Sequence, residues 1–340
     1  DAQESRGLGD VYKRQDMKKT IWALFDDRVG SVNQAKGIIQ ALGDEYDVTY
    51  KHITYNRWAS LPNCLLGASK AGISKDCPVD LSQPYPDIIL SVSRRTTPIA
   101  RYLKRKSQGK SKIVQLMYPG NCGIKELDLI IASQHDAAKC KNGNIFLITG
   151  CPHRITPKEL ELTAEKWKEA FTGLPAPRTA VIIGGAIKGK PFSEENARNL
   201  GLAVKTLYEK TGGSLLITTS RRTGSTAEAL IKEQVKDIPA YTYWWGEEKE
   251  NPLMAFLALS DRIVVTGDSV SMCSEACGTG KPVLVFCGRN WLTPKHYRFV
   301  NSLYEGGFAT ALEDEKALAF TPRNRLDPAS EAAEKIKELF

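Results

Sequence analysis

The stretch RIVVTGDSVSMCSEACGTGKPVLVFC, residues 262–287, carries the clearest fold signal in the chain. An apolar run ends at Gly267-Asp268-Ser269, a short helix-like piece follows, and a second apolar run comes after Gly280-Lys281-Pro282. This is the strand–loop–helix–turn–strand order of a βαβ unit. Asp268 and Ser269 are good N-cap residues, so we expect a helix to begin beside the carboxyl end of the first strand. Open α/β sheets bind ligands in that position.

The rest of the chain repeats this alternation of strands and helices. Two stretches resemble each other, DIILSVSRRTTP at 87–98 and SLLITTSRRTGS at 214–225, and both place Ser-Arg-Arg-Thr after an apolar run. The similarity indicates two related halves, with chance similarity of two strand ends as the alternative. We expect strands at 19–25, 47–55, 87–93, 112–118, 127–133, 144–149, 180–185, 214–220 and 240–245. We expect helices at 32–42, 157–171, 193–210, 252–259, 295–303 and 328–340. A further helix is expected to follow Gly224 and to end at Val235.

The length of 340 residues predicts two domains. Residues 1–16 have no apolar period and precede Met17, so we interpret them as a non-native extension and exclude them. We expect a first domain at 17–172, a stiff Gly/Pro linker at 173–178 and a second domain at 179–325. The remaining residues, 326–340, are expected to form a C-terminal helix.

The same stretch, residues 262–287, also contains a motif that resembles those of known families. Glu275, Gly280 and Pro282 spell E-x-x-x-x-G-x-P, which resembles the donor-nucleotide motif of GT-B glycosyltransferases. Together with TTSRRTGS at 218–225 and DDRVGSVNQ at 26–34, the stretch resembles the mitochondrial fission ELM1-like family. Its bacterial members are described as predicted nucleoside-diphosphate-sugar enzymes. The resemblance implies two Rossmann-like α/β domains in a GT-B arrangement, with Glu275 on the ribose hydroxyls. It also implies that the last helix crosses back to the first domain.

Composition excludes several classes of protein. The apolar share is 42% and the formal net charge is +8, which suits anionic ligands or an anionic membrane surface but is too low to argue for nucleic acid. No apolar run has the ~18 residues that a membrane span needs. The eight cysteines form no C-x-x-C motif, and we find no secretory signal. We therefore expect reduced thiols and a cytoplasmic location, with the inner membrane face as a peripheral site.

The residue types that a nucleoside diphosphate requires gather in the second half. Phosphates favour helix N-termini, close backbone approach and arginine forks, and the G-x-G-x-x-G motif of NAD-binding proteins is absent. A tight turn is the alternative for the glycines, surface charge for the arginines and a solvated helix position for Glu275. The predicted nucleotide-binding residues are Gly184, Gly185, Ser220, Arg221, Arg222, Thr223, Asp268, Ser269 and Glu275. We expect no metal and no other cofactor.

An inverting glycosyl transfer also needs a general base near the acceptor hydroxyl. Candidates in the first half are Asp26, Asp27, His52, His135 and Asp136, and the position of Asp27 in the loop after the first strand favours it. Some relatives carry a histidine where Ser31 stands, so this assignment remains open.

A basic run at 94–112 contains eight lysines and arginines and no acidic residue. Arg94, Arg95, Lys104 and Arg105 are its candidate contacts with an anionic lipid surface or a lipid-linked acceptor, and a solvated helix face is the alternative. The leading function is sugar transfer from a nucleoside-diphosphate sugar to a cell-envelope acceptor. An epimerase or hydrolase of the same fold and a non-catalytic scaffold at a membrane are the two alternatives.

Overall fold

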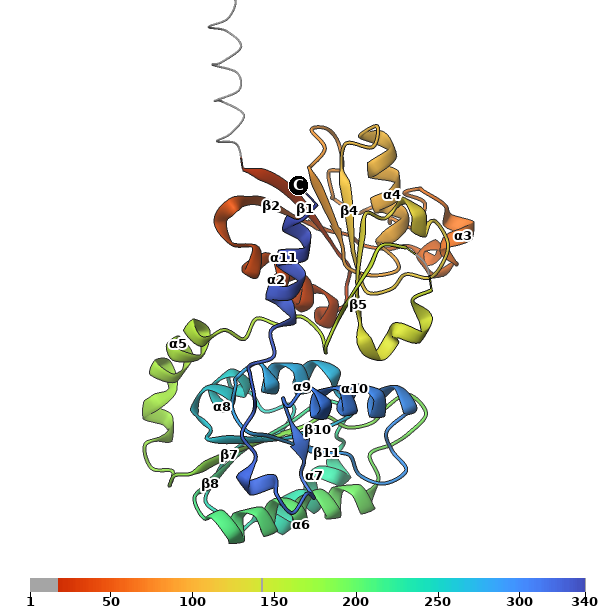
Figure 1. Cartoon of the computed structure of the whole chain (residues 1–340). Coiled ribbons are helices and arrows are strands. Elements are labelled where there is room, and N and C mark those ends of the chain that lie inside the picture. The colour runs from red at the N-terminus through yellow and green to blue at the C-terminus, as the bar shows by residue number, and fades with distance from the viewer. Residues whose placement is uncertain (1–17, 142, 340) are drawn as a thin grey trace, which may run out of the picture. The chain divides into compact units, whose positions relative to one another are not determined.

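The computed structural model describes residues 18–141 and 143–339, which form two compact units (Figure 1). The first unit holds the described residues up to Ala132, those within 137–147, and those from Ser330 onward. The second unit holds residues 133–136 and 148–329. The extension at 1–16 lies outside the described residues. Among the described residues, no helix combines the length and the apolar character needed to cross a membrane.

The first unit is built on a six-stranded sheet with the order β2-β1-β3-β4-β5-β6. The pairs from β2 through β5 are parallel. The chain leaves β1 for β2 on one side and returns to β3 on the other, so the topological switch point lies between β1 and β3. The strands are β1 (Lys19–Phe25), β2 (Tyr46–His52), β3 (Ile88–Ser91), β4 (Lys112–Leu116), β5 (Leu129–Ser133) and β6 (Ile145–Ile148).

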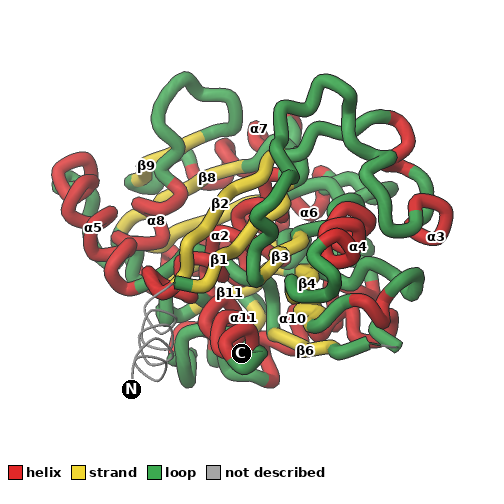
Figure 2. The backbone as a smooth tube through the Cα atoms, turned by 90° about the horizontal axis from the view of Figure 1, so that it is seen from above, coloured by secondary structure: helices red, strands yellow, loops and turns green. Residues whose placement is uncertain are grey.

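Helices cover both faces of this sheet. Figure 1 shows α2 and α11 on one side and α4 on the other. Right-handed crossovers require opposite sides because β1–β2 and β3–β4 advance in opposite directions across the sheet. The helices are α2 (Val29–Leu42), α3 (Asn63–Leu66), α4 (Thr97–Lys106) and α11 (Pro328–Lys337). Between β2 and β3 the chain is mostly loop, drawn in green in Figure 2, and carries the short α3.

The second unit repeats the plan with the strand order β12-β11-β10-β7-β8-β9, and all its pairs are parallel. Its switch point lies between β7 and β10. The strands are β7 (Arg178–Ile183), β8 (Ser214–Thr219), β9 (Ala240–Tyr243), β10 (Arg262–Thr266), β11 (Val283–Phe286) and β12 (Thr310–Ala311). The helices are α5 (Pro157–Trp167), α6 (Glu194–Thr211), α7 (Ser225–Val235), α8 (Leu253–Leu259), α9 (Val270–Cys277) and α10 (Pro294–Glu305).

Alternate residues of the central strands pack into two separate hydrophobic cores, one on each face of the second sheet. Ile263 and Val265 pack with Phe256 and Phe299 on the face that carries α8, α9 and α10. Val264 packs on the opposite face with residues of α6 and α7. A parallel sheet buried on both faces needs such continuous apolar strands, which is why 262–287 signals the fold so clearly.

Short 3₁₀ turns complete the chain at Gly43–Glu45, Arg57–Ser60, Ile124–Glu126, Gln134–Lys139, Lys168–Phe171 and Ala317–Ala319.

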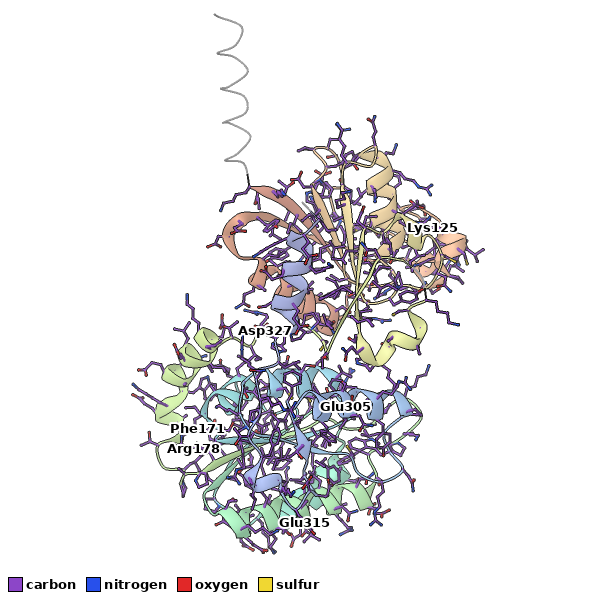
Figure 3. The ribbon with its side chains drawn as sticks, in the orientation of Figure 1. Lys125, Phe171, Arg178, Glu305, Glu315 and Asp327 are labelled. Atoms are coloured by element: carbon purple, nitrogen blue, oxygen red, sulfur yellow. The ribbon has the colours of Figure 1, made fainter. Side chains whose placement is uncertain are left out.

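The segment 173–178, predicted as the linker between domains, lies inside the second unit. The Arg178 guanidinium donates to the Phe171 carbonyl at 3.1 Å, and both residues are labelled in Figure 3. The Ser214 hydroxyl donates to the Pro175 carbonyl at 2.7 Å. Phe171 itself is fully buried in the core of this unit. These contacts fasten the Gly/Pro segment to the second sheet, and the chain passes between the units at residues 133–148 instead.

Candidate functional site

The loops after β7, β8 and β10 lie at the carboxyl edge of the second sheet, beside its switch point. β7 pairs with β8 on one side and with β10 on the other, so the three loops are neighbours. They contain Gly184-Gly185, Ser220 to Thr223, and Asp268-Ser269. Parallel α/β sheets bind ligands at this edge. The structure therefore brings the predicted nucleotide-binding loops together.

Asp268 is the centre of the polar contacts at this edge. Its side chain is fully buried and accepts hydrogen bonds from the Gly185 amide at 2.9 Å and the Thr266 hydroxyl at 2.7 Å. The Arg222 guanidinium pairs with it at 2.8 Å. Burial raises the pKa of Asp268, and the hydrogen bond from Thr266 and the charge of Arg222 oppose that rise. Asp268 therefore binds the three loops to one another.

Gly184 and Gly185 are required by this packing. A Cβ on Gly184 would overlap the Asp268 carboxylate, and a Cβ on Gly185 would overlap the backbone of Arg222. Gly185 also has a φ of +155°, a conformation that L side chains rarely adopt. The two glycines thus let the loops after β7, β8 and β10 approach closely.

The loop after β8 leaves one predicted phosphate ligand uncommitted. The Ser220 and Thr223 hydroxyls both donate to the Gly184 carbonyl, and Arg222 donates to the Ala186 carbonyl at 2.8 Å. Arg221 is exposed and makes no hydrogen bond or ion pair with another described residue. Its guanidinium is available to an anionic ligand.

Glu275 differs from Asp268 although both lie in the same βαβ unit. Ser269 caps α9 by accepting from the Met272 amide, so the helix begins directly after the β10 loop. Glu275 is half-buried on this helix and has no hydrogen-bond or ion-pair partner among the described residues. Burial raises the pKa of its carboxyl to about 7. An incompletely solvated carboxylate without a donor is suited to receive one from a ligand.

His296, in the first turn of α10, belongs to this edge but was not predicted. Its Nδ1 lies 2.7 Å from the Thr293 hydroxyl. Burial lowers the pKa of His296, and the charge of Asp268 opposes that shift, so the two groups are close. The residues RNWLTPKH at 289–296 match no motif with a known spacing, so the sequence alone gives no signal for this position.

Two candidates for the general base, His135 and Asp136, lie in the second unit, although their place in the sequence predicted the first domain. His135 is buried, which lowers the pKa of its imidazole to about 4, and it packs edge-on against Phe299. Asp136 pairs with Lys295 at 2.7 Å. The neutral histidine and the paired carboxylate both have structural partners within this unit.

The first sheet has its own polar cluster at the switch point between β1 and β3. Asp26 is buried, Asp27 is exposed, and the Arg95 guanidinium pairs with both. Arg95 also lies over the Tyr55 ring, 4.5 Å from its centroid. The hydrogen bond from Arg95 lowers the pKa of Asp27. His52, at the end of β2, contacts the Phe25 ring edge-on at 5.3 Å.

The basic run at 94–112 is largely compensated. Arg101 and Arg105 both pair with Glu126, at 2.6 Å and 2.9 Å. Lys104 pairs with Asp128 at 2.6 Å. Arg94 donates to the Leu61 carbonyl at 2.7 Å. These partners come from parts of the chain outside the run, so the local sequence overstates its positive charge.

The described residues contain no group of three or more His, Cys, Asp and Glu side chains arranged to hold a metal ion.

Two Rossmann-like units, each built on a six-stranded sheet with flanking helices, match the GT-B fold class. The family model for mitochondrial fission ELM1 matches residues 29–340. The chain belongs to this family, as the motifs at 26–34, 218–225 and 262–287 predicted.

Relatives and solved structures agree with this classification. Protein RP120 of Rickettsia prowazekii is 30% identical, over 94% of this chain and 97% of that protein. The mitochondrial fission protein ELM1 of Arabidopsis thaliana is 30% identical over 74% of this chain, which spans only 63% of the plant protein.

Two solved epimerases share the fold. The UDP-GlcNAc 2-epimerase of Methanocaldococcus jannaschii aligns with a TM-score of 0.55 at 11% identity, over 94% of this chain and 99% of that one. The UDP-GlcNAc 2-epimerase of Neisseria meningitidis, bound to UDP-GlcNAc, aligns over the same shares with a TM-score of 0.51 at 16% identity.

Proposed function

We propose that the second unit binds a nucleoside-diphosphate sugar at the carboxyl edge of its sheet. One observation carries the proposal: Glu275 has no hydrogen-bond or ion-pair partner among the described residues, whereas Asp268, in the same βαβ unit, accepts from an amide, a hydroxyl and a guanidinium. A ribose diol has two adjacent hydroxyl donors, which match the two oxygens of a carboxylate. The M. jannaschii and N. meningitidis epimerases share this fold, and the latter was solved with UDP-GlcNAc bound.

The remaining groups suit a diphosphate. We assign the phosphate contacts to Arg221, whose guanidinium is uncommitted, and to Arg222, which is partly exposed beside Asp268. The first turns of α7 and α9 offer backbone N–H groups next to these arginines. Ser220, Thr223, Gly184 and Gly185 act by holding the loops together, since their polar groups and space are used within the protein.

For the reaction we propose transfer of the sugar to an acceptor of the cell envelope. The acceptor oxygen attacks the anomeric carbon, the bond from that carbon to the diphosphate oxygen breaks, and the nucleoside diphosphate leaves with the electron pair. Asp27 takes the acceptor proton, since its pairing with Arg95 keeps the carboxylate ionised. Asp27→Asn should then abolish transfer and leave nucleotide binding unchanged.

Epimerisation is the second candidate, and the two epimerases of the same fold favour it. Product analysis separates the candidates. The protein is incubated with UDP-GlcNAc and other labelled nucleotide sugars, with and without an envelope lipid extract. Label in the lipid fraction supports transfer, a changed sugar on the same nucleotide supports epimerisation, and free sugar supports hydrolysis.

An anionic or lipid-linked acceptor at the inner membrane face belongs to the transfer proposal. This part of the proposal is tested by comparing the binding of the protein to vesicles of neutral and of anionic lipid. The compensation of Arg101, Lys104 and Arg105 by Glu126 and Asp128 limits the charge that this face offers. Salt-sensitive binding to anionic vesicles supports a peripheral location, and equal binding to both vesicles opposes it.

A further inference from the structure

The first unit contains a hollow that the proposed donor site does not use. It has a volume of about 580 Å³ and lies between the loop at 70–85 and the helix α4. Lys70, Tyr85, Tyr102 and Lys106 are among its lining residues. Ligand sites commonly have volumes of about 300–1,000 Å³.

The walls of this hollow are held in place by contacts within the first unit. The Asn56 side-chain amide donates to the carbonyls of Ala71 and Ile73, both at 2.8 Å. The Ser74 amide donates to the Thr54 carbonyl at 2.9 Å. Tyr85 packs edge-on against Trp22, 6.4 Å between ring centroids. The loop that forms one wall is therefore anchored to the end of the sheet.

Two ammonium groups gather at one aromatic ring in this hollow. Tyr102 and Lys106 lie one turn apart on α4, and the Lys106 ammonium is 5.8 Å from the Tyr102 centroid. The Lys70 ammonium, from the loop, is 5.2 Å from the same centroid. Neither lysine forms an ion pair with a carboxylate among the described residues. An anion that contacts both ammonium groups would be stabilised by their positive charges.

Groups that bind hydroxyls complete the lining. Ser74 and Ser82 line the hollow, and their hydroxyls make no hydrogen bond with another described residue. The Asp80 carboxylate accepts from the Ser82 amide at 2.9 Å and keeps further acceptor capacity.

We propose that this hollow binds a sugar phosphate, with the phosphate between Lys70 and Lys106 and the sugar hydroxyls on Asp80, Ser74 and Ser82. The phosphate supplies the anion that the lysine pair lacks. The saccharide fills a space that is larger than inorganic phosphate alone requires. This site is independent of the nucleotide site on the second unit.

Calorimetric titration tests the proposal. The probes are glucose 1-phosphate, glucose 6-phosphate, N-acetylglucosamine 1-phosphate and ribose 5-phosphate, with glucose and inorganic phosphate as references. At least one sugar phosphate should bind more tightly than both references. The double variant Lys70→Gln/Lys106→Gln should weaken that binding at least tenfold. Lys75→Gln, on the same loop but outside the lining, should leave it unchanged.

The outcomes separate this site from the nucleotide site. Glu275→Ala should still bind the sugar phosphate, and the double lysine variant should leave any titration with uridine diphosphate unaltered. The proposal is overturned if no sugar phosphate binds, if inorganic phosphate binds equally well, or if the double variant binds like the wild type. It is also overturned if Arg222→Gln, in the second unit, removes the binding.

Discussion

At the scale of single residues, Glu275 and Asp268 show how surroundings decide the role of a carboxylate. Asp268 is buried with an amide, a hydroxyl and a guanidinium around it, and its effect is structural. Glu275 is partly buried with no donor among the described residues. A buried charge without a partner reduces stability, and such costs are retained at sites that bind ligands.

The pH dependence of stability tests this difference. The pKa of Glu275 is about 7 in the folded protein, against an ordinary value of 4.5. A raised carboxyl pKa means that ionisation costs stability, so the cost is absent below pH 4.5 and complete above pH 7. Glu275→Gln should therefore stabilise the protein at pH 8 by on the order of 3 kcal/mol, since the pKa is raised from 4.5 to about 7 and one pKa unit is ~1.4 kcal/mol.

The measurement is the melting temperature of both proteins between pH 4.5 and 8 without nucleotide. The gap between the variant and the wild type should widen as the pH rises. A constant gap over this range would mean that Glu275 is solvated like an ordinary surface residue.

Gly185 provides a second test at the residue scale. Gly185→Ala places a Cβ against the backbone of Arg222, in a conformation that favours glycine. We expect a loss of more than about 3 kcal/mol, since overpacking costs ~1–3 kcal/mol and backbone strain a further ~1–3 kcal/mol. Gly189→Ala is the control, because its φ of +78° is similarly restricted but no atom lies within 4 Å of a Cβ. Chemical denaturation should show a clearly smaller loss for Gly189→Ala, and equal losses would contradict the packing account.

At the scale of helices and strands, the local patterns in the sequence predicted most of the fold. The predicted cap Ser269 is confirmed, and Thr156 and Ser193 cap their helices in the same way, each accepting from the amide three residues later. Their signals are local, because a polar side chain and the amide it caps are neighbours in the chain. The two-residue strand β12 was missed, since so short a strand has no period and forms only by pairing with β11.

The basic helix α4 shows the opposite case. Its positive run could be read from the sequence, but its partners Glu126 and Asp128 are about twenty residues away and meet it only in the fold. Arg101 is 7% exposed, so its pairing with Glu126 matters more than an exposed ion pair would.

A substitution that removes the charge of Glu126 tests how much the Arg101–Glu126 ion pair contributes to the free energy of unfolding. Glu126→Gln leaves Arg101 buried without its carboxylate and should destabilise the protein by about 1–3 kcal/mol. Glu169→Gln removes an exposed carboxylate that has no ion-pair partner among the described residues, and it should change stability by less than about 0.5 kcal/mol. Urea denaturation of both variants measures the difference. Similar values for the two variants would show that the α4 ion pairs are as weak as exposed ones.

At the scale of the whole molecule, the sequence predicted the fold class but not the position of the division. A Gly/Pro segment at 173–178 has the composition of a linker, yet Arg178 and Ser214 bond it to the second unit. Composition reports stiffness and turn preference but not which carbonyl a distant arginine will reach. The loops after β7, β8 and β10 could be predicted to lie together because parallel strands end at one edge of the sheet. The proximity of His296 to these loops could not be predicted, because it depends on how α10 packs.

Limited proteolysis tests this division. Trypsin should cut first after Lys139 or Lys141, in the exposed stretch near the passage between the units, rather than after Arg178. Arg178 is half-buried and bonded to the Phe171 carbonyl, so its backbone is protected. Mass spectrometry of early fragments identifies the site. Early cleavage at Arg178 would restore the Gly/Pro segment as the junction.

The central claim is that Glu275 binds the ribose of a nucleoside diphosphate. Calorimetric titration of the wild type and Glu275→Ala with uridine, guanosine, cytidine, thymidine and adenosine diphosphates tests it most directly. We expect one of these to bind the wild type and to bind Glu275→Ala at least about tenfold more weakly, because a hydrogen bond to a charged group contributes ~1.5–3 kcal/mol. Equal binding to both proteins, or no binding to the wild type, would contradict the claim.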